Sequence, residues 1–205
     1  MRRRTGRRSG SPDTRGAILT AARTAFAGRG YDRASIRGIA AEAGVDPALV
    51  HHYFGTKDQL FLATLDLPIN PAELIPAAVA GGIDGAGRRL VALALSVWDS
   101  PAGAAGAALL RSAMSSEWSA RLLREFLVTQ VLRRVFAQLG ITDDPQSELR
   151  AALVASQLAG LVMTRYLLRF EPLASADPSV IAAAVGPTIQ RYLTDDLDVP
   201  APAAD

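Results

Sequence analysis

Residues 36–54, IRGIAAEAGVDPALVHHYF, contain the pattern that decides the fold of the N-terminal part of the chain. Apolar residues recur at three- and four-residue steps as far as Ala43, which predicts a first short helix. Gly44 permits the left-handed backbone conformation that a tight turn between two helices often needs. Asp46 followed by Pro47 is typical of the start of a second helix, because aspartate caps free N–H groups and proline fits the first turn. The stretch therefore predicts a helix-turn-helix.

The second helix, residues 47–54, is expected to have two different faces. Val50 and Phe54 are four residues apart, so both are expected to face the core. The remaining side chains are expected to point outward, where they can enter the major groove of DNA, while nearby polar and basic residues contact phosphates. The residues expected to contact DNA are Ser35, Arg37, Pro47, Ala48, Leu49, His51, His52, Tyr53 and Lys57.

Positive charge is concentrated in the first 60 residues. They contain 11 lysines and arginines against 5 acidic residues, whereas residues 61–205 contain 11 against 15. Such asymmetry indicates contact with a polyanion, either nucleic acid or an anionic membrane surface. Residues 1–12 are rich in Arg, Gly and Ser, which predicts a disordered basic arm that serves either as a solubilising tail or as a DNA-contacting arm.

Helical periodicity continues through the rest of the chain, with no convincing strand alternation and no fixed-period repeat. We expect an all-α protein of nine or ten helices, with a three-helix DNA-binding domain at 13–60 and a larger helical bundle at 61–205. Helix starts are expected at residues that can cap free N–H groups. These residues are Thr56, Asn70, Asp84, Ser100, Ser116, Asp144 and Asp177.

The stretch from about residue 13 to residue 62 resembles the DNA-binding domain of the TetR family of transcriptional regulators. The resemblance rests on Ala-Phe-Ala-x-x-Gly-Tyr at 25–31, Ser-Ile-Arg-x-Ile-Ala-x-x-Ala-Gly-Val at 35–45 and Val-x-His-Tyr-Phe-x-x-Lys-x-x-Leu at 50–60. Residues 153–174 are similar, more weakly, to the C-terminal domain of one subgroup of that family.

The resemblance implies roles for single residues. In the family, the residues at the positions of Arg37 and Lys57 commonly contact phosphate. Leu49 and His51 stand where the family commonly has Thr or Ser and then Tyr, so Leu49 is expected to meet a thymine methyl group and His51 a phosphate or a base. Gly55 stands where Lys or Arg is frequent, which removes one expected phosphate contact.

The composition excludes several kinds of site. The chain has no cysteine, which excludes disulfides, Cys-ligated zinc and a cysteine nucleophile. Its only two histidines, His51 and His52, are adjacent, and neighbours on a helix point about 100° apart, so no metal site is expected. Residues 61–205 contain no cluster of polar residues that resembles a catalytic site, so we expect neither an enzyme nor a cofactor.

The segment 151–164 is apolar on most sides, which requires burial by more than its own chain. The small residues expected at a two-fold homodimer interface are Ala152, Ser156, Ala159 and Gly160. The resemblance implies a small-molecule effector bound between helices of the larger domain, and the composition suits an apolar one. The residues expected to line its pocket are Trp98, Met114, Trp118, Met163 and Tyr166.

These observations predict a DNA-binding transcriptional regulator of the TetR type, a repressor that a small molecule releases from a near-palindromic operator. The alternative is an all-α interaction module or an enzyme that uses the basic arm on a membrane surface. The longest uncharged run in the C-terminal half, between Arg150 and Arg165, is 14 residues. A spanning helix needs about 20. No apolar stretch follows the N-terminal arginines, so we expect no membrane partner and a cytoplasmic location.

Overall fold

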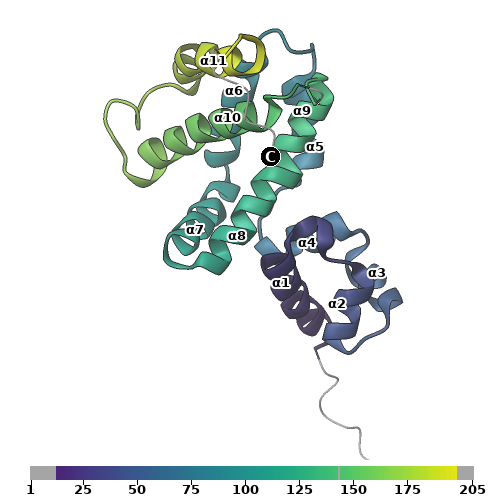
Figure 1. Ribbon diagram of the computed structural model, residues 1–205. Helices are drawn as coiled ribbons and strands as arrows, with labels where there is room; N and C mark the ends of the chain where they lie inside the picture. The colour runs from purple at the N-terminus through teal and green to yellow at the C-terminus, as the bar shows by residue number, and fades with distance from the viewer. Residues whose placement is uncertain (1–12, 143, 198–205) are drawn as a thin grey trace, which may run out of the picture. The chain divides into compact units, whose positions relative to one another are not determined.

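The computed structural model describes residues 13–142 and 144–197 (Figure 1). These residues form helices and loops without a strand, and their ten continuous helical segments confirm the predicted all-α class. The predicted basic arm, residues 1–12, lies outside the described residues. The chain divides into two compact units, one ending at Asp66 and the other beginning at Leu67.

The described residues of the first unit, 13–66, form four helices, and the last of them extends beyond the predicted domain boundary at residue 60. Leu60, Phe61 and Leu65 of this last helix are buried, and the helix packs against the first one. The unit therefore ends at Asp66, where the apolar face of the helix ends. The helices are α1 (Thr14–Arg33), α2 (Ile36–Ala43), α3 (Pro47–Phe54) and α4 (Lys57–Leu65).

An aromatic cluster joins α1 to α4. The ring centroids of Phe26 and Phe61 lie 4.8 Å apart in an edge-to-face arrangement, and Tyr31 lies 5.3 Å from Phe61. Gly30, with φ 77° and ψ 165°, interrupts the helical backbone of α1. Tyr31 follows this break and contributes its ring to the cluster, so the end of α1 is fixed against the core.

The described part of the second unit contains seven α-helices and two π-helical turns. The π-helical turns lie inside the continuous helical stretches 117–139 and 147–167, where the hydrogen-bond spacing of the backbone changes locally. The elements are α5 (Pro71–Val79), α6 (Ala86–Trp98), α7 (Pro101–Ser115), α8 (Glu117–Glu125), η1 (Phe126–Leu132), α9 (Arg133–Leu139), α10 (Ser147–Val162), η2 (Met163–Leu167) and α11 (Pro178–Thr194).

Most of the predicted helix starts are confirmed by side-chain caps. Thr56, for example, forms a capping box with Gln59 at the start of α4. Two predicted starts are wrong. Helix α6 begins after Gly85, whose φ of 70° turns the chain into the helix, instead of after Asp84. Helix α10 begins at Ser147, directly after Gln146, whose N–H donates to the Asp144 carboxylate at 2.7 Å. The remaining confirmed caps are Asn70, Ser100, Ser116 and Asp177.

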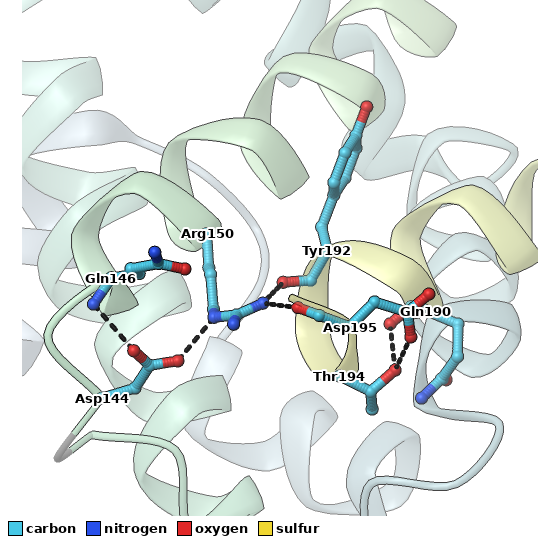
Figure 2. A network of polar contacts seen from close by, with 7 residues as sticks. All are labelled: Asp144, Gln146, Arg150, Gln190, Tyr192, Thr194 and Asp195. Atoms are coloured by element: carbon cyan, nitrogen blue, oxygen red, sulfur yellow. Dashed lines mark hydrogen bonds and ion pairs between the residues drawn. The ribbon is translucent and has the colours of Figure 1, made fainter. Parts of the chain in front are cut away.

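Arg150 joins the start of α10 to the end of α11 (Figure 2). Its guanidinium donates to the Asp144 carboxylate at 2.5 Å and to the carbonyl oxygens of Tyr192 and Asp195 at 2.9 and 2.8 Å. The N–H of Gln146 and the Arg150 guanidinium lower the pKa of Asp144. The Arg150 side chain is only 9% exposed, so this cluster is an interior clamp between the two helices.

Helices α6 and α11 cross at a contact made largely of backbone. A Cβ atom added at Gly87 would lie 2.3 Å from the Gly186 carbonyl oxygen, and one added at Gly186 would lie 2.7 Å from the Arg88 Cα. Gln190 bridges the crossing, since its Oε1 accepts from the Gly87 N–H and its Nε2 donates to the Ile83 carbonyl, both at 3.0 Å. The two helices therefore approach as closely as their backbones allow.

The corner between α6 and α7 is equally tight. A Cβ at Gly103 would lie 2.1 Å from the Trp98 carbonyl oxygen. Gly103 therefore lets α7 turn directly against the end of α6.

Over the described ranges no single helix is long and apolar enough to cross a membrane. Helices α6 and α7 pass that test only as a pair, which is bent by 91°.

The α6–α11 crossing generates the first testable expectation. Gly87→Ala places a methyl group against backbone that cannot rotate away, so we expect a loss of about 2–3 kcal/mol in the free energy of unfolding. The matched control is Gly28→Ala, because a Cβ on this exposed helical glycine meets nothing within 4 Å. The control should be neutral or stabilising by about 0.5–1 kcal/mol. Urea unfolding followed by circular dichroism compares the variants, and equal stability would contradict the close crossing.

Candidate nucleic-acid interface and interior cavity

Helix α3 has the two faces that its sequence predicts. Val50 and Phe54 are buried in the core of the first unit. On the opposite side the side chains of Leu49 and Tyr53 are 39% and 44% exposed. Ala48, His51 and His52 are also exposed, and Pro47 is half-buried. A helix of this kind presents a mixed apolar and polar surface that fits the major groove.

The turn before α3 is fixed by its own hydrogen bonds. Gly44 adopts φ 68°, and its N–H donates to the Ala41 carbonyl at 3.2 Å. The Val45 N–H donates to the Ala40 carbonyl at 3.0 Å, which completes the end of α2. The Asp46 carboxylate then accepts from the Ala48 N–H at 2.7 Å and caps α3. Because every step is bonded locally, α3 leaves α2 at a fixed angle.

The ring of His51 is oriented by the backbone. Its Nδ1 lies 2.9 Å from the carbonyl oxygen of Gly55, the glycine with φ 71° that ends α3. A carbonyl oxygen can only accept, so Nδ1 carries a hydrogen and donates. In the neutral ring Nε2 is then an acceptor, which suits the amino group of adenine or cytosine better than a phosphate oxygen. Gly55 thus orients a side chain of α3 through its backbone carbonyl.

Lys57 begins α4 and is held against its own unit. Its Nζ lies 4.3 Å from the centroid of the Tyr31 ring and 3.4 Å from the carbonyl oxygen of Asp32. Burial lowers the pKa of Lys57, and the Asp32 carboxylate opposes this shift. The Tyr31 hydroxyl in turn donates to the Asp58 carboxylate. An ammonium group has three N–H donors, so this position is compatible with a phosphate contact.

The other two residues predicted to contact phosphate lie at the start of α2. The Ser35 hydroxyl oxygen accepts from the Gly38 N–H at 3.1 Å and caps the helix. Ser35 and Arg37 are both exposed in the first turn. The N–H groups of a helix start attract anions, so the two side chains stand where a phosphate is favoured.

Two further arginines of the first unit have different surroundings. Arg15 of α1, which the sequence analysis did not single out, places its guanidinium 5.3 Å from the centroid of the Phe54 ring at the end of α3. Arg15 thus adds a cation beside α3. Arg29 is paired with Glu42 at 2.7 Å, which links α1 to α2 on the surface. Net charge alone could not separate these roles, because they depend on tertiary contacts.

No group of three or more His, Asp or Glu side chains that could hold a metal ion occurs in the described part of the chain. The ring of His52 contacts Tyr53, with centroids 5.4 Å apart, while the Nδ1 of His51 is directed to Gly55. The two histidines therefore have separate surroundings.

The second unit contains a partly open cavity of about 240 Å³. Its wall is formed by residues 67–75 and by α6, α7, α8, η1, α9 and α10, and it includes Trp98 and the backbone of Gly106. The π-helical turn η1 contributes Phe126, Leu127 and Val131. π-Helical turns occur frequently at functional sites, which favours this cavity as a binding site.

Of the five residues predicted to line a pocket, the structure places only Trp98 in the wall of this cavity. Met114 and Trp118 are 71% and 42% exposed at the surface of the unit. Met163 and Tyr166 lie in η2, outside the wall. Tyr166 stacks on Trp98 with centroids 5.5 Å apart, and its hydroxyl donates to the Asp99 carboxylate at 2.8 Å. Burial, followed by the Asp99 contact, raises the pKa of Tyr166.

The four small residues predicted at a dimer interface are all exposed on α10. Ala152, Ser156 and Ala159 lie on one helical face, and Gly160 is next to it. A Cβ at Gly160 would meet nothing within 4 Å. Ala159 also belongs to the cavity wall, so the exposed face of α10 and the cavity share a residue.

Comparisons with known families cover both units. A family model described as bacterial regulatory proteins of the tetR family matches residues 18–64, and one described as the tetracyclin repressor-like C-terminal domain matches residues 84–193. The second match alone spans more than half of the chain. The chain belongs to the TetR family.

Curated relatives match about a quarter of this TetR-family protein. The HTH-type transcriptional regulator BetI of Brucella anthropi is 48% identical over 54 residues, and the regulator Mb3439c of Mycobacterium bovis is 50% identical over 58 residues. These matches cover 26% and 28% of this chain. The chain spans only 28% and 31% of the length of those two relatives.

Solved structures of TetR-family regulators match over most of the chain. The regulator SCO0857 of Streptomyces coelicolor is 43% identical, with 93% of this chain and all of that chain covered and a TM-score of 0.45. A putative regulator from Mesorhizobium loti is 21% identical, with 88% and 95% covered and a TM-score of 0.45.

The backbone contact of His51 generates an expectation for the tautomer. At about pH 8.5, where an ordinary imidazole is neutral, we expect the hydrogen of His51 on Nδ1 and Nε2 without a hydrogen. Long-range ¹H–¹⁵N correlation spectra of the TetR-family protein distinguish the two nitrogens. His52 serves as the internal reference on the same helix, and His51→Asn assigns the signals. A spectrum with the hydrogen of His51 on Nε2 would contradict the Gly55 contact.

Proposed function

We propose that this protein is a transcriptional repressor that binds double-stranded DNA through α3 and is released by a small molecule. The observation that carries the proposal is the exposed face of α3 in a chain of the TetR family. The turn before α3 is held by its own hydrogen bonds, which fixes the orientation of this face. This face has a size and chemistry that suit the major groove.

Reading of the operator would be divided between two sets of residues. Leu49 offers an apolar contact to a thymine methyl group, and the Nε2 of His51 offers an acceptor to a base amino group. Pro47, Ala48, His52 and Tyr53 complete the exposed surface. Ser35, Arg37 and Lys57 would bind phosphates and fix the position of α3 along the groove.

A homodimer would give the operator its near-palindromic form. The exposed small residues of α10 allow a second copy of the chain to approach closely. Two-fold symmetry then gives the dimer two copies of α3. Two such helices contact half-sites separated by about one helical turn of DNA, roughly 34 Å.

The cavity of the second unit is the proposed effector site. A ligand bound there can weaken DNA binding only if it binds more tightly to a state in which the reading helices do not fit DNA. We propose a cytoplasmic location and no catalytic activity, since a repressor of this kind needs neither export nor a reaction.

The test of DNA binding uses fluorescence anisotropy with the DNA upstream of the protein's own gene, a scrambled duplex and a salt series. We expect binding to the upstream DNA to be at least about 1,000-fold tighter than to the scrambled duplex. Arg37→Ala should weaken binding to both duplexes and reduce the slope of log affinity against log salt by about 0.9, the value for one phosphate. His51→Ala should instead reduce the preference for the upstream DNA.

The matched control for Arg37→Ala is Arg191→Ala, because Arg191 is an exposed arginine of the second unit. It should leave both affinity and salt slope unchanged. Equal affinity for all sequences in a genome-wide selection would overturn the proposal. Flotation with anionic vesicles tests the alternative membrane role, and strong vesicle binding without DNA preference would favour it.

Dimerisation has its own test at Gly160. Gly160→Arg adds a large charged side chain that a single chain can accommodate, because a Cβ there meets no other atom. We expect wild-type protein to sediment as a dimer and the variant as a monomer with unchanged helix content. Gly28→Arg is the control, since Gly28 is also an exposed helical glycine with open space around it. A monomeric wild type, or a variant that still dimerises, would contradict the proposed interface.

A further inference from the structure

We propose that the cavity of the second unit selects uncharged, hydrocarbon-rich molecules and rejects molecules with a charged head group. This inference rests on the proposed function in treating the cavity as the effector site. It adds the chemical class of the effector, which is argued from the wall and from the partners of the nearby cations.

The wall contains no charged side chain and no side-chain hydroxyl, carboxylate or amide. Every residue that lines it is Leu, Ile, Val, Ala, Pro, Gly, Phe or Trp. The only side-chain polar atom available among these residue types is the indole nitrogen of Trp98, which can donate but not accept. The part of a molecule that lies against this wall therefore exchanges water for apolar groups, which favours hydrocarbon.

The interior arginines of the same unit have other partners. Arg165 donates to the carbonyl oxygens of Leu173 and Ala176, at 2.5 and 2.9 Å. Arg89 donates to three carbonyl oxygens of the loop and helix before α6. Neither arginine, nor Arg150 in its clamp, lines the cavity. Arg124 and Arg133 line an adjoining hollow and not this wall. A carboxylate or phosphate that is buried against the wall would therefore meet no cation, and burial of an unpaired charge is strongly unfavourable.

Tyr166 does not supply a polar anchor either. It stacks on Trp98, but it is absent from the cavity wall, and its hydroxyl donates to Asp99 and lies 3.4 Å from the Leu95 carbonyl. The Tyr166 hydroxyl is thus engaged with Asp99 and the α6 backbone.

The volume limits the size of the ligand. A cavity of about 240 Å³ lies just below the range of about 300–1,000 Å³ for typical ligand pockets. Apolar cavities of about 150 Å³ already bind benzene. A single alkyl chain or a small ring system therefore matches this cavity better than a large polycyclic compound does.

The direct test measures binding in the absence of DNA. The variant Trp118→Phe retains Trp98 as the only tryptophan, and Trp118 is a surface residue whose replacement should be tolerated. The probes are decanol, decanoate and decylammonium, which share one alkyl chain, at about pH 8, where the two ionisable head groups are charged. Concentrations stay below those at which the probes form micelles. Trp98 fluorescence should report saturable binding of decanol and binding at least about 100-fold weaker for both charged probes.

A pair of variants on α6 shows whether the cavity is the binding site. Ala94 lines the cavity, whereas Ala92 lies two residues earlier on the exposed side of the same helix. Ala94→Phe should reduce decanol affinity at least about tenfold by filling space, and Ala92→Phe should not change it. If Ala94→Phe does not fold, Ala155→Phe fills the cavity from α10 and serves the same purpose.

The outcomes separate the ligand class from the repressor function. Charged probes that bind as tightly as decanol, or the absence of binding by all three, would overturn the proposed class. Decanol affinity that is equal in Ala94→Phe and Ala92→Phe would overturn the assignment to this cavity. Decanol that binds the cavity without releasing the protein from its operator would leave the ligand class intact and contradict the effector role. Failure to bind any specific DNA would affect only the proposed function.

Discussion

The close crossing of α6 and α11 at Gly87 and Gly186 is the constraint on which the rest of the second unit depends. Helix α6 supplies Trp98 and much of the cavity wall, while α11 is tied through Arg150 to the start of α10. Any widening of the crossing would move the wall away from α10 and change the shape of the cavity. The lack of a side chain at Gly87 and Gly186, together with the bridging amide of Gln190, thus sets the volume of the cavity. The cavity wall and the Arg150 contacts therefore belong to the same set of packed helices.

The first unit could be predicted from sequence in nearly all its essentials, because its signals are local. Gly44, Asp46 and Thr56 act on backbone groups within four residues, so their roles follow from the order of residues alone. The division of α3 into a buried and an exposed face also follows from helical spacing. The contact of His51 with Gly55 is local too, but a sequence does not reveal which rotamer a histidine adopts. Arg15 was missed for another reason: its position over Phe54 needs the fold of α1 against α3.

The second unit was predictable in class but not in its site. Its helices were identified from periodicity and caps, whereas a cavity arises from the packing of segments far apart in the chain. Trp118 and Met114 looked like pocket residues because large apolar side chains are usually buried, yet both lie at the surface. The π-helical turn at Phe126–Leu132 has no reliable sequence signal. Gly87 and Gly186 did carry one, since glycine inside a helix is unfavourable by about 1 kcal/mol and often marks a close contact.

Gly103 and Gly106 place the backbone of α7 directly against Trp98, with a Cβ at Gly106 lying 3.2 Å from the indole ring. Part of the cavity wall is therefore main chain, which point mutations cannot reshape by exchanging one side chain for another. Adding a side chain at either glycine would displace the tryptophan or open the corner. Substitutions that change the shape of this cavity gradually are therefore confined to the leucines, valines and alanines of the other walls. The corner made by Trp98 and the α7 backbone stays fixed while the rest of the wall can be varied.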